Sequence, residues 1–358
     1  MVHLMEPQSP LITTIIPTYC RAKLLKRAIL SVLNQTFPAF QVCVYDNASS
    51  DDTKLVVSEL AKTDSRIKYY RHSENIGAAA NFDFGLRKVN TPFFSFLSDD
   101  DILLPNFFET AMYSLSANPD AMFYAGLTLM TEDGKVARVA KENGPFGRFS
   151  PPDGLMEILN TTGLIWTSIV FRSEVIHRVG FLDAEAGGPL DVDFCLRIAA
   201  HHPIIISDVP GAIFTHHDRS LLTATSDFRV MWPGFEYIGN KIMSDESLPL
   251  DVRIHAKKKL NETSNYYLSV IGERACIKGE IDNVYEIAAL LAQRNNKVRS
   301  NMLINLSKLR GLSEPTYYLV DQIRRLFIFC TSLHTIVVGR RKYKQLQNQY
   351  GNYLQYLQ

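Results

Sequence analysis

Residues 92–101 read PFFSFLSDDD, an apolar segment that ends in three consecutive aspartates. Aromatic residues favour strands, and an apolar run without alternation is typical of a strand that is covered on both faces. Ligands of open α/β sheets bind beyond the carboxyl ends of the strands. The stretch therefore predicts a buried strand followed by a polar turn with a functional role.

Outward from this stretch, strand-like and helix-like segments alternate. Strands are predicted at 11–16, 40–45, 66–70, 92–97, 121–130, 165–172 and 204–207, and helices at 23–33, 52–62, 75–88 and 191–200. A hairpin turn is predicted at 132–135. Strands alternating with helices predict a mostly parallel sheet that carries helices on both faces. Asp46 and Asn47, which follow the second strand, are then expected at the same edge as the aspartates.

Beyond about residue 228 the strand signals fade and helical spacing dominates, so we predict a boundary near residue 225. From residue 251 onward the chain carries 17 Lys and Arg against 8 Asp and Glu, and the first 250 residues carry 21 against 29. Such asymmetry favours contact of the tail with an anionic surface, although a merely solvated basic face explains it equally well. No nucleic-acid motif is present, so nucleic acid is excluded as a partner.

The cysteines and the N-terminus bear on the compartment. The five cysteines are scattered and form no CxxC pair, which indicates free thiols in a reducing, cytoplasmic setting. No basic stretch leads into an apolar one at the start, so no signal peptide is predicted. An apolar segment within 317–338, flanked by Arg324-Arg325 and Arg340-Arg341-Lys342, is too short to span a bilayer. It suits a helix lying on the cytoplasmic face of the inner membrane, and a buried core helix is the alternative.

Three adjacent carboxylates repel one another unless a cation is present. A hard divalent ion such as Mg²⁺ or Mn²⁺ relieves the repulsion, and such ions bind through one or two carboxylates together with substrate phosphates. The plainer alternative is that one aspartate caps a helix beginning at Ile102.

Several motifs together resemble the family 2 glycosyltransferases in order, spacing and strand context. They are Ile15–Tyr19, Ser31–Thr36, Val44–Thr53, Asn75–Gly77, Ser98–Asp101 and Leu190–Arg197. The resemblance covers roughly residues 10–222. It implies an α/β GT-A fold, with a mostly parallel Rossmann-like sheet, over residues 1–225. The nucleotide-binding half is expected at about 10–101 and the acceptor half at about 102–225, followed by a helical region, 226–358, for membrane contact or oligomerisation.

The resemblance also implies site residues. Those expected to bind the nucleotide sugar are Pro17, Thr18, Tyr19, Arg21, Asp46, Asn47, Asn75 and Asp99. Asp46 suits the imino N–H of uracil or thymine. The implied metal residues are Asp100, Asp99 and His217, for Mg²⁺ or Mn²⁺, although Ser98 replaces the usual first aspartate. Asp191 is the implied catalytic base, at a helix N-terminus that keeps it ionised, although Leu190 replaces the usual glutamate.

The resemblance implies an inverting glycosyltransferase of the bacterial polysaccharide and O-antigen type. A sugar would pass from a nucleoside-diphosphate sugar, UDP or dTDP favoured, to a hydroxyl of a glycan or lipid-linked glycan. A degenerate relative that acts as a sugar-binding scaffold is the alternative. A dehydrogenase is excluded because Pro17–Arg21 stands where the first strand–helix turn would need GxGxxG.

Overall fold

The computed structural model describes residues 9–132, 134–140, 144–160, 164–215, 228–310 and 344–357. The chain divides into two compact units. The first comprises Met1–Glu185, Leu190–Ser220 and Gln347–Gln358, and the second comprises Ala186–Pro189 and Leu221–Leu346.

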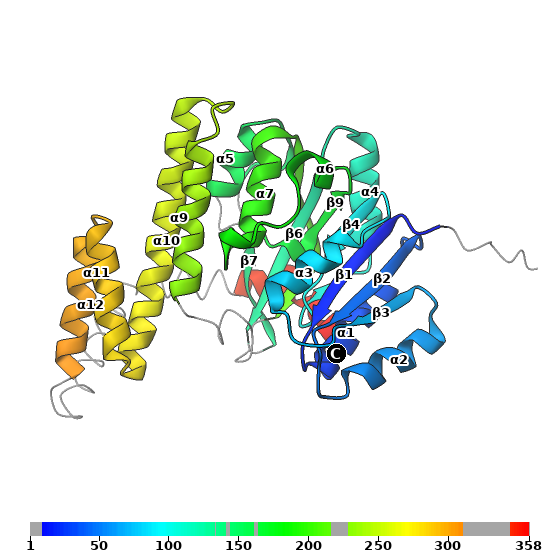
Figure 1. Ribbon diagram of the computed structural model, residues 1–358. Helices are drawn as coiled ribbons and strands as arrows, with labels where there is room; N and C mark the ends of the chain where they lie inside the picture. Colours follow the sequence, from blue (N-terminus) through cyan, green and yellow to red (C-terminus); the bar gives the residue numbers. More distant parts are fainter. Residues whose placement is uncertain are drawn as a thin grey trace, which may run out of the picture. The chain divides into compact units, whose positions relative to one another are not determined.

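The first unit is built on one sheet, to which the described residues contribute ten strands in the order β3-β2-β1-β4-β9-β6-β10-β5, with β7 on β6 and β8 on β10. The strands are β1 (Ile12–Thr18), β2 (Phe40–Asp46), β3 (Ile67–Arg71), β4 (Phe93–Phe96), β5 (Ile102–Leu103), β6 (Phe123–Glu132), β7 (Lys135–Ala140), β8 (Gly147–Phe149), β9 (Ile169–Arg172) and β10 (Ile204–Thr215). β1 to β4 are parallel to one another (Figure 1). β9 is antiparallel to both β4 and β6, so β6 runs in the same direction as β4, and β10 pairs parallel to β6.

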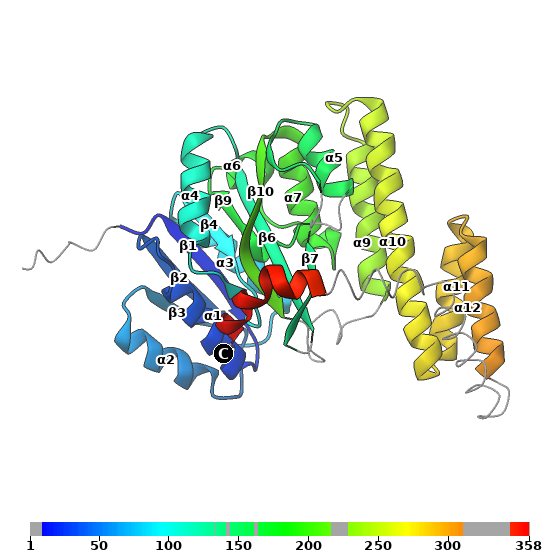
Figure 2. The same ribbon diagram turned by 180° about the vertical axis from the view of Figure 1, so that it is seen from behind.

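Helices cover both faces of this sheet (Figures 1 and 2). Helices α1 (Ala22–Leu33), α2 (Thr53–Thr63) and α4 (Phe107–Ala117) share one apolar core with the strands. Helices α3 (Ala78–Arg87) and α7 (Leu190–His201) pack on the other face. Shorter elements are α5 (Asp153–Asn160), η1 (Trp166–Ser168), α6 (Val175–Val179), η2 (Ala184–Ala186) and η3 (Gly351–Leu357).

The alternation of side chains along β1 explains the two layers, since successive strand residues point to opposite faces. Ile12 and Ile16 lie in the core shared with α1. Ile15 faces α3, where a Cβ on Gly85 would stand 2.5 Å from its Cγ2 atom. Gly85 is therefore the residue that allows α3 to approach the sheet closely.

The fold confirms the predicted class, a mostly parallel sheet with helices on both faces, and the predicted 132–135 hairpin joins β6 to β7. Two expectations are wrong in detail. Residues 166–168 form the 3₁₀ helix η1 before β9. No helix begins at Ile102: residues 102–103 form β5, which pairs with β10, and α4 begins at Phe107. The triple aspartate is therefore not a helix cap.

The second unit consists of helices α9 (Phe228–Met243), α10 (Leu250–Lys278), α11 (Ile281–Gln293) and α12 (Lys297–Arg310). Its core includes Phe228, Leu268, Ile287 and Leu303. The helical character predicted for this region is confirmed for residues 228–310. The apolar segment within 317–338 and its basic flanks lie outside the described residues. In the part of the chain that is described, no helix is both long and apolar enough to cross a membrane.

Candidate active site

The triple aspartate lies in a tight turn directly after β4. Asp101 N–H donates to the Ser98 carbonyl, which closes the turn. Asp99, Asp100 and Asp101 are all buried, with exposed fractions of 5%, 7% and 0%. Buried carboxylates need cationic or hydrogen-bonding partners, and each of the three has at least one.

Arg21, which immediately precedes α1, bridges two of these carboxylates. Its Nη1 atom lies 3.0 Å from Asp99 Oδ1 and 2.9 Å from Asp100 Oδ2. Thr18 Oγ1 donates to Asp99 Oδ2 at 2.7 Å. Burial and the Asp100 charge raise the pKa of Asp99 to about 6, against the opposing effects of Arg21 and Thr18. The structure thus brings together four residues that the sequence predicted for the site.

Asp101 has a different place from its two neighbours. Its Oδ2 atom accepts from Thr167 Oγ1 at 2.8 Å, and its Oδ1 atom accepts from Thr215 N–H at 3.0 Å. Burial, followed by the Asp100 charge, raises the pKa of Asp101 well above its usual range. Asp101 therefore ties the turn to η1 and to the end of β10.

Asp99 and Asp100 present a donor set that fits a divalent ion. Their oxygens converge on one cationic nitrogen, and carboxylate oxygens are the ligands that Mg²⁺ and Mn²⁺ prefer. Among the described residues, no three His, Cys, Asp or Glu side chains form a metal cluster. The third predicted ligand, His217, lies outside the described residues.

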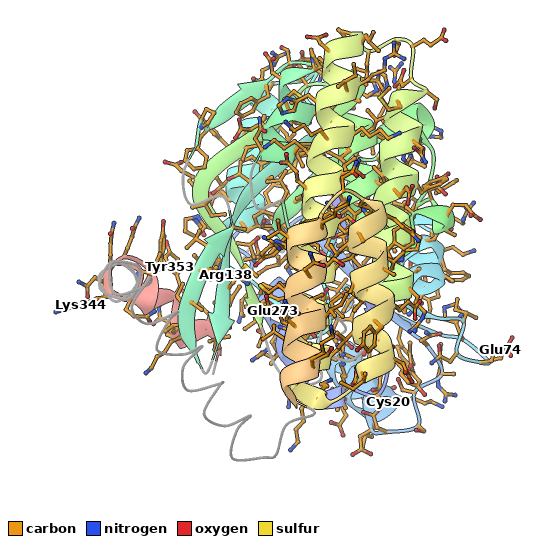
Figure 3. The ribbon with its side chains drawn as sticks, turned by 90° about the vertical axis from the view of Figure 1, so that its left-hand side faces the viewer. Cys20, Glu74, Arg138, Glu273, Lys344 and Tyr353 are labelled. Carbon is orange, nitrogen blue, oxygen red and sulfur yellow. The ribbon has the colours of Figure 1, made fainter. Side chains whose placement is uncertain are left out.

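The loops after β1, β2 and β3 meet beside this turn. Asn47 N–H donates to the Thr18 carbonyl at 2.9 Å, and Asn47 Nδ2 donates to Asn75 Oδ1 at 2.8 Å. Tyr19 is 49% exposed, so its ring is accessible to a base. Figure 3 shows Cys20 in the β1–α1 loop and Glu74, the neighbour of Asn75, extending outward from the β3–α3 loop. Thr18, Asn47 and Asn75 are therefore held together as the sequence predicted.

Asp46 is fully buried, and both its oxygens have partners. Oδ1 accepts from Ser49 N–H at 2.8 Å, while Oδ2 accepts from Tyr69 Oη at 2.5 Å and lies 3.3 Å from Arg71 Nε. Tyr69 was not among the residues predicted for the site, although its place two residues before Arg71 on the strand next to β2 was a usable signal. Each carboxylate oxygen has two lone pairs and can accept more than one hydrogen bond. Contact between Asp46 and a base therefore stays a prediction.

Asp191 lies in the first turn of α7. Its Oδ1 atom accepts from Val192 N–H at 2.9 Å, and among the described residues only backbone N–H groups, those of Asp191 and Val192, bond the carboxylate. Burial raises the pKa of this half-buried carboxyl to about 6. Asp193, the other acid of the helix, is fully committed, since it pairs with Arg197 at 2.6 Å and is 1% exposed. Asp191 is thus the available carboxylate of α7.

The packing of α7 sets the level of Asp191 along the sheet. The Phe194 ring lies 5.5 Å from that of Phe171 on β9, and Phe171 pairs with Phe94 on β4. Only residues 202 and 203 separate the helix from β10, so the helix runs back along the sheet and its first turn points toward the carboxyl ends of β4 and β1. Asp191 precedes Phe194 by one turn, or about 4.5 Å. Asp191 therefore lies at the same edge of the sheet as the aspartate turn.

Comparison with known proteins gives a consistent picture. Residues 13–180 match the model of glycosyl transferase family 2. The chain is 38% identical over 130 residues to the GalNAc(5)-diNAcBac-PP-undecaprenol beta-1,3-glucosyltransferase of Campylobacter jejuni. The aligned residues make up 36% of this chain and 41% of that protein. It is 29% identical over 216 residues to an uncharacterized glycosyltransferase of Rickettsia felis, covering 60% of this chain and 33% of that protein. The chain thus spans less than half of these two relatives.

Solved structures share the fold at low sequence identity. S. aureus TarS 1–349 in complex with UDP-GlcNAc superimposes with a TM-score of 0.62 at 16% identity, covering 88% of this chain and 91% of that one. A mannosyltransferase of Pyrobaculum calidifontis, in complex with GDP-Man and Mn²⁺, gives a TM-score of 0.53 at 18% identity, covering 86% of this chain and 89% of that one. At these identities the likeness shows a common fold.

Proposed function

We propose that this chain, whose residues 13–180 match the model of glycosyl transferase family 2, transfers a sugar from a nucleoside-diphosphate sugar to a hydroxyl of a glycan or lipid-linked glycan. The reaction is a single displacement that inverts the anomeric centre. The catalytic domain is residues 1–225, with the donor bound by 10–101 and the acceptor by 102–225. The membrane contact predicted for the tail stays part of this proposal, since its residues lie outside those described.

The observation that carries this proposal is the state of Asp191. A general base works best when its pKa lies near the working pH and it reaches the proton that it removes. Burial raises the pKa of Asp191 to about 6, and no side chain among the described residues bonds its carboxylate. Asp191 Oδ2 accepts the proton of the acceptor hydroxyl while the oxygen of that hydroxyl attacks the anomeric carbon from the face opposite the diphosphate.

The loops after β1 and β2 hold the nucleotide. Tyr19 stacks on the base, while Asn47 keeps its loop against Thr18. Asp46 selects uracil or thymine, which favours UDP- or dTDP-sugars. Support for a nucleotide-sugar donor comes from the UDP-GlcNAc complex of TarS, and support for a lipid-linked acceptor comes from the C. jejuni relative.

Asp99 and Asp100 hold a divalent ion beside the diphosphate, and the Mn²⁺ complex of the Pyrobaculum mannosyltransferase supports its use. Bound there, Mg²⁺ or Mn²⁺ supplies positive charge that stabilises the departing diphosphate. Arg21, which pairs with both aspartates, turns toward a phosphate oxygen of the bound donor in this proposal.

The test is release of nucleoside diphosphate from a panel of UDP-, dTDP- and GDP-sugars, with Mn²⁺ and extracted lipid-linked glycans as acceptors. We expect acceptor-dependent release from a UDP- or dTDP-sugar, and NMR of the product should show an inverted anomeric configuration. Binding of donors without release under any of these conditions would favour the scaffold alternative, and a retained configuration would exclude the single displacement.

A further inference from the structure

Helix α1 satisfies the backbone that follows the aspartate turn. Ser31 Oγ accepts from Leu103 N–H at 3.1 Å. Two residues beyond the end of α1, Gln35 Nε2 donates to the Leu104 carbonyl at 2.7 Å and Gln35 Oε1 accepts from Phe108 N–H at 3.0 Å. Ser31 and Gln35 thus belong to a polar row that runs along α1 and just past its C-terminal end. The row fixes β5 and the start of α4 against the helix.

Arg27 is the member of this row that lies nearest the turn, four residues before Ser31. Its Nη2 atom donates to the Asp100 carbonyl at 2.7 Å and to Thr215 Oγ1 at 3.2 Å. Thr215 in turn donates its N–H to Asp101 Oδ1 at 3.0 Å. These contacts close a ring that joins α1, the aspartate turn and the end of β10.

Stability alone does not account for an arginine at this position. Arg27 Nε is buried and has no hydrogen-bond partner among the described residues, and an unpaired buried N–H opposes folding. Arg172, elsewhere in the same unit, shows the contrast. Its Nε donates to the Ala121 carbonyl at 2.8 Å and its Nη2 to the Leu115 carbonyl at 2.6 Å.

We propose that Arg27 is a positioning residue for the aspartate turn, which it fixes by holding the Asp100 carbonyl and Thr215 together. The peptide group between Asp100 and Asp101 is planar. Arg27 fixes the carbonyl of this group, and Thr167 and Thr215 fix the carboxylate of Asp101 that follows it. Together these contacts restrict the direction of the Asp100 side chain. The inference rests on the proposed role of Asp99 and Asp100 as ligands of the donor's metal ion.

The test compares Arg27→Lys with Arg172→Lys in the full chain, by calorimetric titration of Mn²⁺ in the presence of saturating UDP. A lysine ammonium is a compact point charge and cannot reproduce the guanidinium geometry. We expect Arg27→Lys to weaken Mn²⁺ binding by about tenfold or more, the range found when groups supporting metal ligands are lost. Arg172→Lys should keep the wild-type affinity even if its melting temperature falls.

Thr215→Val is the second variant, which decides the matter if Arg27→Lys fails to fold. It removes the hydroxyl that Arg27 bonds but keeps the N–H that Asp101 bonds, and we expect Mn²⁺ affinity to fall at least threefold, a loss of one hydrogen bond. Unchanged Mn²⁺ affinity in both variants, or an equal loss in Arg172→Lys, would overturn the inference alone. Absence of Mn²⁺ binding by the wild-type protein with UDP would overturn the proposed metal site as well.

Discussion

Arg21 forms an ion pair with Asp100, with its Nη1 atom 2.9 Å from Asp100 Oδ2. The same nitrogen lies 3.0 Å from Asp99 Oδ1, so one guanidinium pairs with both aspartates and offsets only part of their charge. A divalent ion that binds these carboxylates must share them with Arg21 or displace it. We therefore expect Arg21 to oppose metal binding while it supports nucleotide binding.

Replacing Arg21 by methionine tests this competition. Without the guanidinium, the two carboxylates attract Mn²⁺ more strongly, and we expect the free protein to bind Mn²⁺ about tenfold more tightly, a change of about 1.4 kcal/mol. Nucleotide affinity should fall, because Arg21 no longer reaches phosphate. Calorimetric titrations measure both quantities. Arg87→Met, which removes an exposed pair with Asp83 on α3, is the control and should change neither; weaker Mn²⁺ binding by Arg21→Met would contradict the competition.

The pH dependence of turnover should report the titration of Asp191. The base must be ionised to accept a proton, and its pKa is about 6. With donor and Mn²⁺ saturating, kcat should therefore rise about tenfold per pH unit below pH 6 and level off above it. Saturating metal keeps Asp99, whose pKa is also about 6, ionised. A kcat independent of pH between 5 and 7, over about two units around that pKa, would argue against Asp191 as the base.

The same pKa shift predicts that Asp191 costs stability at neutral pH. A carboxyl group whose pKa rises from 3.8 to about 6 on folding binds more protons in the folded state, so its contribution to stability is lost as pH rises through this window. Asp191→Asn should raise the free energy of unfolding at pH 7.5 by about 1–3 kcal/mol, with little change near pH 4. Denaturant unfolding at both pH values measures this.

Asp193→Asn is the matched control, two residues along α7, and should have the opposite sign. Asp193 is buried in its pair with Arg197, whose Nη2 also donates to the Phe181 carbonyl at 2.9 Å. Breaking a buried pair leaves an uncompensated charge and costs about 3–5 kcal/mol. Destabilisation of similar size by both substitutions would show that burial of the ionised Asp191 carboxylate does not cost stability.

The predicted contact between Asp46 and a pyrimidine base can be tested with UDP methylated at N3, which lacks the imino N–H. We expect the wild-type protein to bind this analogue about tenfold more weakly than UDP, the value of a lost hydrogen bond to a charged group. Tyr69→Phe frees a lone pair on Asp46 and should preserve the discrimination. Equal binding of UDP and its methylated form by the wild-type protein would show that Asp46 does not contact the base and only stabilises the loop after β2.

The sequence predicted the elements whose signals are local. The apolar spacing of α1 and the strand-like runs of β1, β2 and β4 each occupy consecutive residues, and their order implied the sheet and the edge where the site lies. The grouping of Thr18, Asn47 and Asn75 followed from the same topology, because the loops after parallel strands meet at one edge.

The parts that the sequence left undetermined depend on long-range contacts. Asp101 bonds Thr167 and Thr215, which are 66 and 114 residues away, so no local pattern separates it from Asp100. The distinct environments of Asp191 and Asp193 likewise come from Arg197, whose guanidinium is held by the backbone before α7. Trp166 was expected in a strand because its neighbours are apolar, but it lies in a 3₁₀ turn where its ring packs 4.4 Å from Phe96.

The central claim is that Asp191 removes the acceptor proton, and single-turnover sugar transfer by Asp191→Asn tests it most directly. With donor, Mn²⁺ and acceptor at saturation, we predict a rate about 10²–10⁴-fold below the wild-type rate, the usual contribution of a general base. Nucleotide affinity should be unchanged. A transfer rate within a few-fold of the wild type, in protein that binds the donor normally, would contradict the account.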